Sequence, residues 1–158
     1  MTGYGKRLAL GAVLSTTIAL AAVPAHGQQP QATRATVVAN PLVVELRAPG
    51  GNARTGSQLQ IRADLTNLGD PQLSDVLAQL RVPPAIKIRP TDIRDLGILG
   101  GDASETAAWQ ICSDTPGSFV LLVAVAATTA DGLSLTAESG AIVVEIAPGR
   151  RPCPRAFG

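Results

Sequence analysis

Apolar and polar side chains alternate with a period of two along most of the chain from Thr36 onward. This is the pattern of half-buried β-strands, because successive side chains of a strand point to opposite faces. In the stretch 59–66, LQIRADLT, Leu59, Ile61 and Leu65 share one face and polar residues share the other. Together with the turn residues between segments, the pattern predicts strands at 42–47, 59–66, 76–82, 86–89, 93–99, 104–112, 119–128 and 133–146, the last of them bent or bulged near Ser139-Gly140.

Seven to eight short strands in a chain of this length predict an all-β fold, arranged as an antiparallel β-sandwich. The stretch 74–80 also has helix-like spacing of its leucines, but its brevity and the following Pro83-Pro84 favour a strand. The alternation predicts a core that contains Leu59, Ile61, Leu65, Leu80, Trp109, Ile111, Phe119, Leu121 and Val123.

The N-terminus has the features of a secretory signal peptide. Lys6 and Arg7 precede an apolar run at 8–23, and small residues then allow cleavage after Ala25 or Gly27. The apolar run is shorter than the roughly 20 residues that a membrane span needs, so a cleaved peptide is favoured over an anchor. We expect a signal peptide at 1–27, a flexible leader at 28–35, a sandwich domain at 36–147 and a Pro/Arg-rich tail at 148–158. The mature protein is then secreted or periplasmic, without a membrane span.

Processing also changes the charge balance. Loss of Lys6 and Arg7 leaves eleven basic residues against twelve acidic ones. This balance gives no strong overall field to attract nucleic acid or an anionic membrane. The tail carries Arg150, Arg151 and Arg155 and is predicted to be a solvated extension, with the alternative that these arginines meet an acidic surface.

Turn and core signals follow one another in an order typical of a known group of domains. They are Asn67-Leu68-Gly69, Pro83-Pro84, Leu99-Gly100-Gly101, Trp109 and Pro116-Gly117. Over roughly residues 38–147 this order resembles bacterial extracellular immunoglobulin-like domains of the CARDB, NEW3 and DUF11 type. The resemblance implies an immunoglobulin-like β-sandwich, and its motifs describe a fold rather than a chemistry.

The stretch 107–119, AAWQICSDTPGSF, contains two residues whose side chains suggest a functional role, Trp109 and Cys112. Trp109 is in phase with apolar neighbours, which favours a core position over a sugar-stacking platform. Cys112 has one partner within the chain, Cys153, and an exported protein favours a disulfide between them. The alternatives are a disulfide to another chain and a catalytic thiol. The thiol is disfavoured because processing removes or isolates His26 and leaves no base to activate it.

Other motifs for catalysis are weak. The sequence has no nucleophile elbow, no phosphate-binding glycine loop and no Cys/His cluster for zinc. Asp92, Asp95 and Asp102 lie in one region, where they suggest glycoside hydrolysis or a Ca²⁺ site, but turn formation is the favoured interpretation. We therefore expect no enzyme activity, no metal and no cofactor.

Two functions remain as hypotheses. The first is a non-enzymatic module for protein–protein interaction or structural support at the cell envelope, with an envelope or extracellular protein as its partner. The second is a carbohydrate-binding module for envelope or extracellular glycan, which needs exposed aromatics. After processing only Trp109, Phe119 and Phe157 remain, and the pattern places the first two in the core. On the strand 119–128 the outward positions are also apolar, so Val120 and Leu122, with Ala124 and Ala126, are the predicted interaction face.

Overall fold

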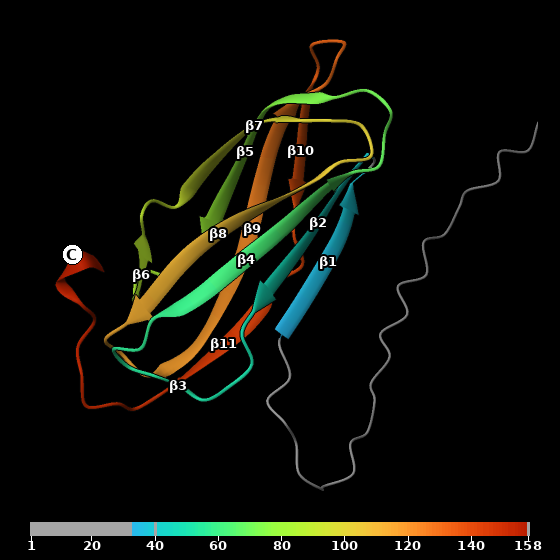
Figure 1. The fold of residues 1–158 in the computed structure, drawn as a ribbon. Coiled ribbons are helices and arrows are strands. Elements are labelled where there is room, and N and C mark those ends of the chain that lie inside the picture. The colour runs from blue at the N-terminus through green and yellow to red at the C-terminus, as the bar shows by residue number, and fades with distance from the viewer. Residues whose placement is uncertain (1–32, 40, 158) are drawn as a thin grey trace, which may run out of the picture.

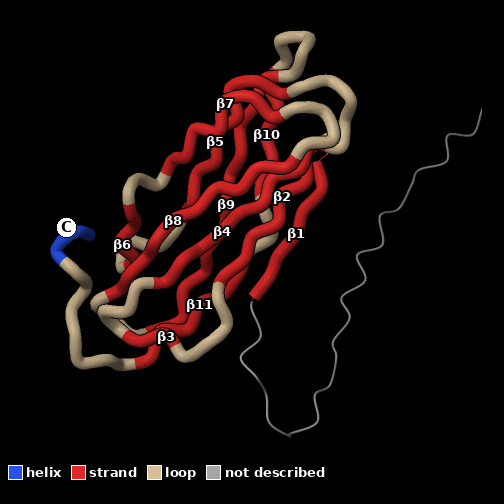
Figure 2. The backbone as a smooth tube through the Cα atoms, viewed as in Figure 1, coloured by secondary structure: helices blue, strands red, loops and turns tan. Residues whose placement is uncertain are grey.

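The computed structural model of the protein describes residues 33–39 and 41–157. The predicted signal peptide at 1–27 and the leader residues 28–32 lie outside the described residues. Strands make up most of the described chain, and one short helix lies near its C-terminal end (Figure 2). No helix in this part of the protein has the length and hydropathy of a membrane span.

The described strands form two sheets that pack face to face (Figure 1). The first sheet has the order β1-β2-β4-β8-β6, and the second has the order β3-β11-β9-β5-β7, with β10 also paired to β9. This arrangement confirms the predicted immunoglobulin-like β-sandwich. The elements are β1 (Thr33–Ala39), β2 (Leu42–Ala48), β3 (Ala53–Arg54), β4 (Leu59–Asn67), β5 (Leu73–Arg81), β6 (Ile86–Arg89), β7 (Ile93–Leu99), β8 (Ser104–Ser113), β9 (Gly117–Thr128), β10 (Ser134–Glu138), β11 (Ile142–Ala147) and the 3₁₀ helix η1 (Arg155–Phe157).

Long antiparallel ladders join the strands of the first sheet. β4 pairs with β2, where Val44 lies opposite Leu65, and with β8, where Ile61 lies opposite Trp109. Paired residues of neighbouring strands point to the same face of a sheet. This register therefore turns all four apolar side chains toward the second sheet, and all four are buried.

The second sheet is centred on β9. β5 flanks β9 on one side, while β10 and β11 pair with successive parts of it on the other side. Between the pair Glu138–Ala124 and the pair Ile142–Leu121, the β10–β11 side has one extra residue, which is a β-bulge. At this bulge Ser139 Oγ accepts a backbone N–H of β9 at 2.9 Å, so the buried donor is satisfied. The predicted bend at this position is confirmed.

All eight predicted strand segments are present, and three further features raise the strand number above the predicted seven to eight. β1 begins at Thr33, within the predicted leader and before the predicted domain start at Thr36, because its backbone pairs with β2 over its full length. β3 is a two-residue strand parallel to β11. The bulge divides the segment predicted at 133–146 into β10 and β11. The stretch 74–80 is part of β5, as predicted, and not a helical turn.

The core lies between the two sheets. Trp109 is 1% exposed, and its indole Nε1 donates to the backbone carbonyl of Asp92 at 3.0 Å, so the buried N–H has a partner. Leu59, at the first position of β4, is half-buried and packs against the edge of the core. The other residues of the predicted core are buried: Ile61, Leu65, Leu80, Trp109, Ile111, Phe119, Leu121 and Val123.

Asn67 joins two loops at one end of the sandwich. Its buried side-chain Nδ2 donates to the carbonyls of Pro71 at 2.9 Å and Gly100 at 3.0 Å. Its Oδ1 accepts the Gly69 N–H at 3.0 Å. The Asn-Leu-Gly signal of the sequence therefore holds the β4–β5 loop against the β7–β8 loop.

The C-terminal tail folds back onto the outer side of the first sheet. Cys112 of β8 and Cys153 form a disulfide with a Cα–Cα distance of 5.9 Å, which confirms the predicted pairing within one chain. No thiol is therefore free for catalysis or for a bond to another chain. The sequence pattern did not place Phe157 in the core. Its ring is nevertheless buried beside this disulfide, because η1 packs against β6. The tail is thus a packed segment rather than a wholly solvated one.

Candidate protein interface

The predicted interaction face on β9 lies on the outer side of the second sheet. Inward and outward positions alternate strictly along this strand, so Phe119, Leu121 and Val123 enter the core. Val120 points outward and is 53% exposed, while Leu122 and Ala124 are half-buried. Within the described residues, no other element covers this strand, and its outward side chains face solvent between the neighbouring strands.

Apolar side chains from three neighbouring strands extend this surface. Val143 of β11 lies opposite Val120 and is 46% exposed. Leu77 of β5 lies opposite Ala126 and is 40% exposed, and Ile93 of β7 is 47% exposed. We define the apolar face as Leu77, Ile93, Val120, Leu122, Ala124, Ala126 and Val143.

The upper part of the apolar face is hollowed. A depression of about 470 Å³ lies over β9, between β5 and β7 on one side and β10 on the other. The small side chains of Ala124 and Ala126 line it beside the larger Leu77 and Ile93. The outward residues of β9 are alanines here, so the side chains of the neighbouring strands extend further from the sheet than those of β9. The shape suits insertion of an apolar side chain.

Polar groups surround the hollow. Arg81 Nη1 of β5 and Glu138 Oε1 of β10 form an ion pair at 2.8 Å across the end of the hollow. Gln79 Nε2 donates to Asp92 Oδ2 at 2.8 Å. An apolar floor with a polar rim is the usual construction of a protein-binding surface.

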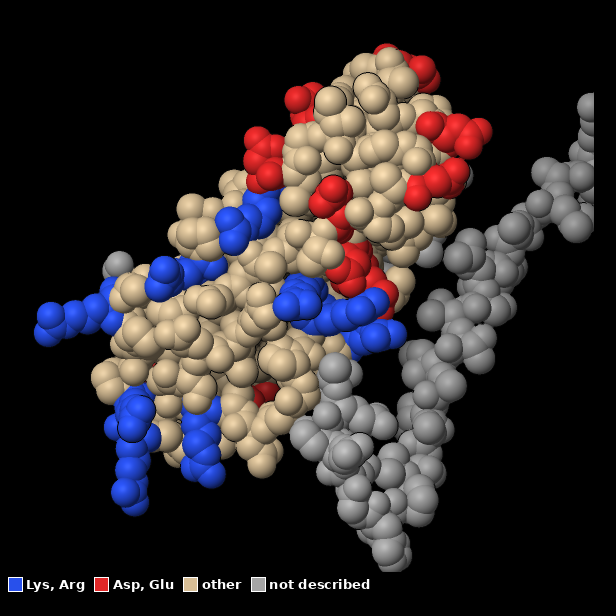
Figure 3. All heavy atoms as spheres, viewed as in Figure 1, with Lys and Arg blue, Asp and Glu red and all other residues tan. Residues whose placement is uncertain are grey.

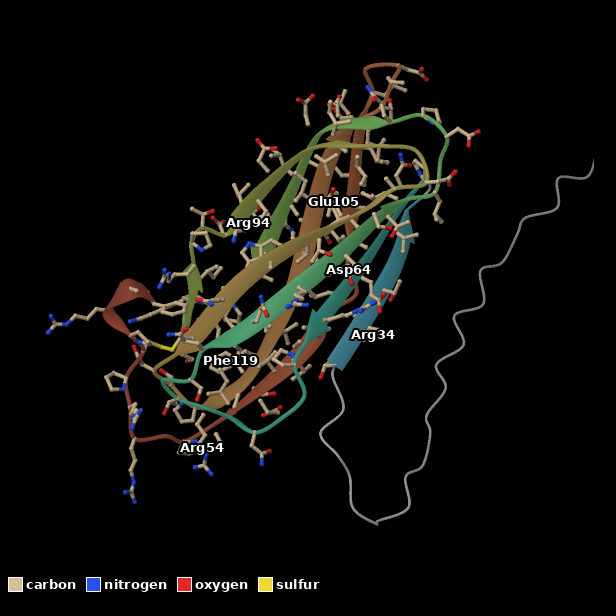
Figure 4. The ribbon with its side chains drawn as sticks, viewed as in Figure 1. Arg34, Arg54, Asp64, Arg94, Glu105 and Phe119 are labelled. Atoms are coloured by element: carbon tan, nitrogen blue, oxygen red, sulfur yellow. A yellow bond between two sulfur atoms is a disulfide. The ribbon has the colours of Figure 1, made fainter. Side chains whose placement is uncertain are left out.

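The outer face of the first sheet is different, because most of its outward residues are charged or polar. Arg47 lies between Glu45, at 2.7 Å, and Asp64, at 3.4 Å, while Arg34 contacts Glu45 from β1 at 2.6 Å. Figure 4 shows Arg34 and Asp64 on this side of the molecule. The hydrogen bond from Arg47, together with the charges of both arginines, holds the pKa of Glu45 below its ordinary value despite partial desolvation. These four charged residues therefore pair with one another within the face.

The aromatic residues do not form a sugar-stacking platform. Trp109, Phe119 and Phe157, the aromatic residues of the described chain, are all buried. A pyranose ring stacks on an exposed aromatic face, which these positions do not offer. The structure therefore places Trp109 in the core, in agreement with its alternation.

Of the three aspartates that suggested catalysis or Ca²⁺ binding, two make local hydrogen bonds and the third lies in a turn. Asp92 accepts the hydrogen bond from Gln79, and Asp95 Oδ1 accepts the Gly97 N–H at 2.9 Å. Asp102 lies in the β7–β8 turn with a φ of 55°. No group of at least three His, Cys, Asp or Glu side chains suited to a metal occurs within the described residues.

The sequence identified the β9 part of the apolar face and missed its neighbours. Leu77 and Val143 each alternate with inward residues of their own strands, and this signal could have marked them as outward apolar positions. Ile93 begins its strand and had no comparable signal. Their association with β9 depends on strand pairing between distant segments.

Comparisons with known proteins give structural similarity alone. No protein-family model and no curated protein matches the sequence. The GAE domain of yeast GGA1 aligns with a TM-score of 0.52 and 9% identity over 71% of this chain and 97% of that one. A CARDB domain from Pyrococcus furiosus aligns with a TM-score of 0.49 and 14% identity over 68% and 94% of the two chains. A PapD-like domain of human CEP192 aligns with a TM-score of 0.45 and 11% identity over 85% and 100%.

These similarities describe the fold. The chain has an immunoglobulin-like sandwich, the fold that its turn signals predict. At such low identities the shared fold carries no information on a ligand or a reaction.

Proposed function

We propose that this chain is an exported, non-enzymatic interaction module that binds another protein of the cell envelope through the apolar face. The observation that carries the proposal is the exposure of this face, together with its hollow of about 470 Å³. Soluble proteins rarely leave adjoining large apolar side chains in water unless a partner covers them. The intramolecular disulfide agrees with an oxidising compartment.

A protein partner fits the surface better than a glycan. The floor of the hollow is formed by aliphatic side chains, and it can receive a hydrophobic anchor residue of a partner. The Arg81–Glu138 pair at its rim offers polar contacts to the partner's backbone or side chains. Carbohydrate binding is the alternative, and binding to protease-digested envelopes separates the two.

The test uses a variant that places two negative charges on the apolar face, Val120→Glu with Ala126→Glu. Both positions are exposed, so the fold is retained. The matched control, Gln60→Glu with Ser104→Glu, adds the same charge at exposed positions on the outer side of the first sheet. Each protein is purified after export, and mass spectrometry determines its N-terminus, which is expected at His26 or Gln28.

The measurement is co-sedimentation with envelope preparations, untreated or digested with protease. We expect the wild type and the control to bind untreated envelopes, and we expect the face variant to lose at least about 10-fold in affinity, as for the loss of interface anchors. Protease digestion should abolish the part of the binding that depends on this face. Binding through the face that survives digestion and is competed by soluble glycan would establish the carbohydrate alternative. Equal binding by the face variant and the control would disprove the site.

A further inference from the structure

Charged side chains are segregated between the two ends of the sandwich, although the net charge is close to zero. Figure 3 shows acidic groups gathered over the upper end and basic groups projecting from the lower end. In Figure 4, Glu105 lies toward the upper end and Arg54 lies at the lower end. The acidic end comprises Asp70, Asp75, Asp102, Glu105 and Asp131, and the basic end comprises Arg54, Arg89, Arg150, Arg151 and Arg155.

The five arginines of the basic end are exposed and carry no ion pair within the described chain. The carboxylates beside them have other partners. Asp114 binds Lys87 at 3.0 Å and accepts the backbone N–H of Cys153 at 2.5 Å, and Glu145 accepts the Ser118 hydroxyl. With Lys87 this end carries six cationic groups against these two carboxylates, so the carboxylates offset only part of its positive charge.

The backbone that carries these arginines is held in place. The Gly149 N–H donates to Thr55 Oγ1 at 2.7 Å, and the disulfide fixes Cys153 to β8. Between these points the tail passes so close to Gly56 that a Cβ there would lie 2.1 Å from the Arg151 carbonyl oxygen. Gly56 also has a φ of 78°, which glycine adopts without strain. The tail is thus anchored while its guanidinium groups extend into solvent.

The arginines reach the basic end from three separate segments. Arg54 comes from β3, Arg89 from β6, where its guanidinium carbon lies 5.8 Å from the Phe157 ring centroid, and the others from the tail. Guanidinium groups bind phosphate oxygens through paired hydrogen bonds and lose little hydration on doing so. Positive groups that project from one end of an elongated domain can contact a flat, phosphate-bearing surface together, while the acidic groups at the far end are kept away from it.

We propose that the basic end docks on the phosphate headgroups of an anionic lipid surface and orients the sandwich end-on. In this orientation the apolar face stands perpendicular to the membrane and stays free for a protein partner. The docking does not depend on the function proposed for that face. The net charge of the sequence does not indicate this site, because it sums over two ends of opposite charge.

The test is co-sedimentation of the disulfide-bonded protein with two kinds of lipid vesicle. One kind is phosphatidylcholine alone, and the other is equal parts of phosphatidylcholine and phosphatidylglycerol. We expect binding to the anionic vesicles alone, and we expect added salt to weaken it. The variant Arg150→Gln with Arg151→Gln and Arg155→Gln should bind about 100-fold more weakly, since each arginine near an anionic surface contributes roughly a five-fold effect.

Two matched variants complete the design. Arg34→Gln with Arg62→Gln and Arg81→Gln removes the same charge away from the basic end, and it should lose much less affinity than the tail variant. The apolar-face variant, Val120→Glu with Ala126→Glu, should bind the vesicles as well as its matched control, Gln60→Glu with Ser104→Glu. Both variants add two negative charges away from the basic end. Absence of binding to anionic vesicles, or equal losses in the two arginine variants, would overturn the proposal. A loss confined to the apolar-face variant would assign the lipid contact to that face and also overturn it.

Discussion

The outer faces of the two sheets are built on similar alternating strands but carry different side chains. On the first sheet, outward residues such as Arg47 and Asp64 pair with one another, and the C-terminal tail covers the lower part around Cys112. On the second sheet, outward residues such as Val120 and Val143 are aliphatic, and no described segment lies over them.

This difference is the physical basis of the interaction site proposed above. A polar face is satisfied by water and by its own ion pairs, so it gains little from being covered. Covering an aliphatic face with a complementary surface lowers the free energy of the system, because apolar area is removed from water. The outer side chains of the first sheet are therefore paired with one another or solvated, whereas those of the apolar face expose aliphatic surface to water.

The largest effect on stability is expected from removing the disulfide that holds the C-terminal tail against the first sheet. In the variant Cys112→Ser with Cys153→Ser, the loop of sequence separation 41 is no longer closed in the unfolded state. The free energy of unfolding should fall by up to roughly 4 kcal/mol, as loop-entropy arithmetic gives for this length. Chemical denaturation with and without reductant measures this effect. Reductant should destabilise the wild type and leave the variant unchanged, and a wild type insensitive to reductant would contradict the expectation.

The second prediction compares the two sides of β9 at adjacent positions. Leu121→Ala creates a cavity in the core and should lower the free energy of unfolding by about 3 kcal/mol. Val120→Ala on the apolar face should lower it by less than about 1 kcal/mol, because the valine is already half in water. Urea denaturation of both variants tests this difference. Similar losses at the two positions would mean that the apolar face is covered in the folded protein.

The smallest effect concerns the ion pairs on the first sheet. Arg47 and Arg34 lower the pKa of Glu45, so this carboxylate stabilises the fold at neutral pH, and its contribution is lost as pH falls through the lowered pKa. Glu45→Gln should lower the melting temperature at neutral pH by no more than ~3 °C. The difference from the wild type should shrink between about pH 5 and about pH 3. Glu138→Gln, at the more exposed pair on the second sheet, is the control and should change the melting temperature less. A difference that grows on acidification would contradict the sign of the pKa shift.

Much of the sandwich could be predicted from local patterns. Alternation located the predicted strands, and it assigned Trp109 to the core, because a side chain one position along a strand points to the opposite face. The same argument identified Val120 and Leu122 as outward apolar residues. Features that depend on pairing between distant segments were not predictable in this way. β1 is stabilised by backbone bonds to β2, and Phe157 is buried because the disulfide returns the tail to the sheet.

The sequence by itself determines the class of fold, the positions of the turns, the inward residues and the doubly apolar character of β9. These properties depend on the order of neighbouring residues and on the twofold periodicity of a strand. The tertiary structure decides which strands extend the apolar face and how the opposite charges gather at the two ends. Arg54, Arg89 and Arg150 are far apart along the chain, and only strand pairing and the disulfide bring them to one end of the molecule.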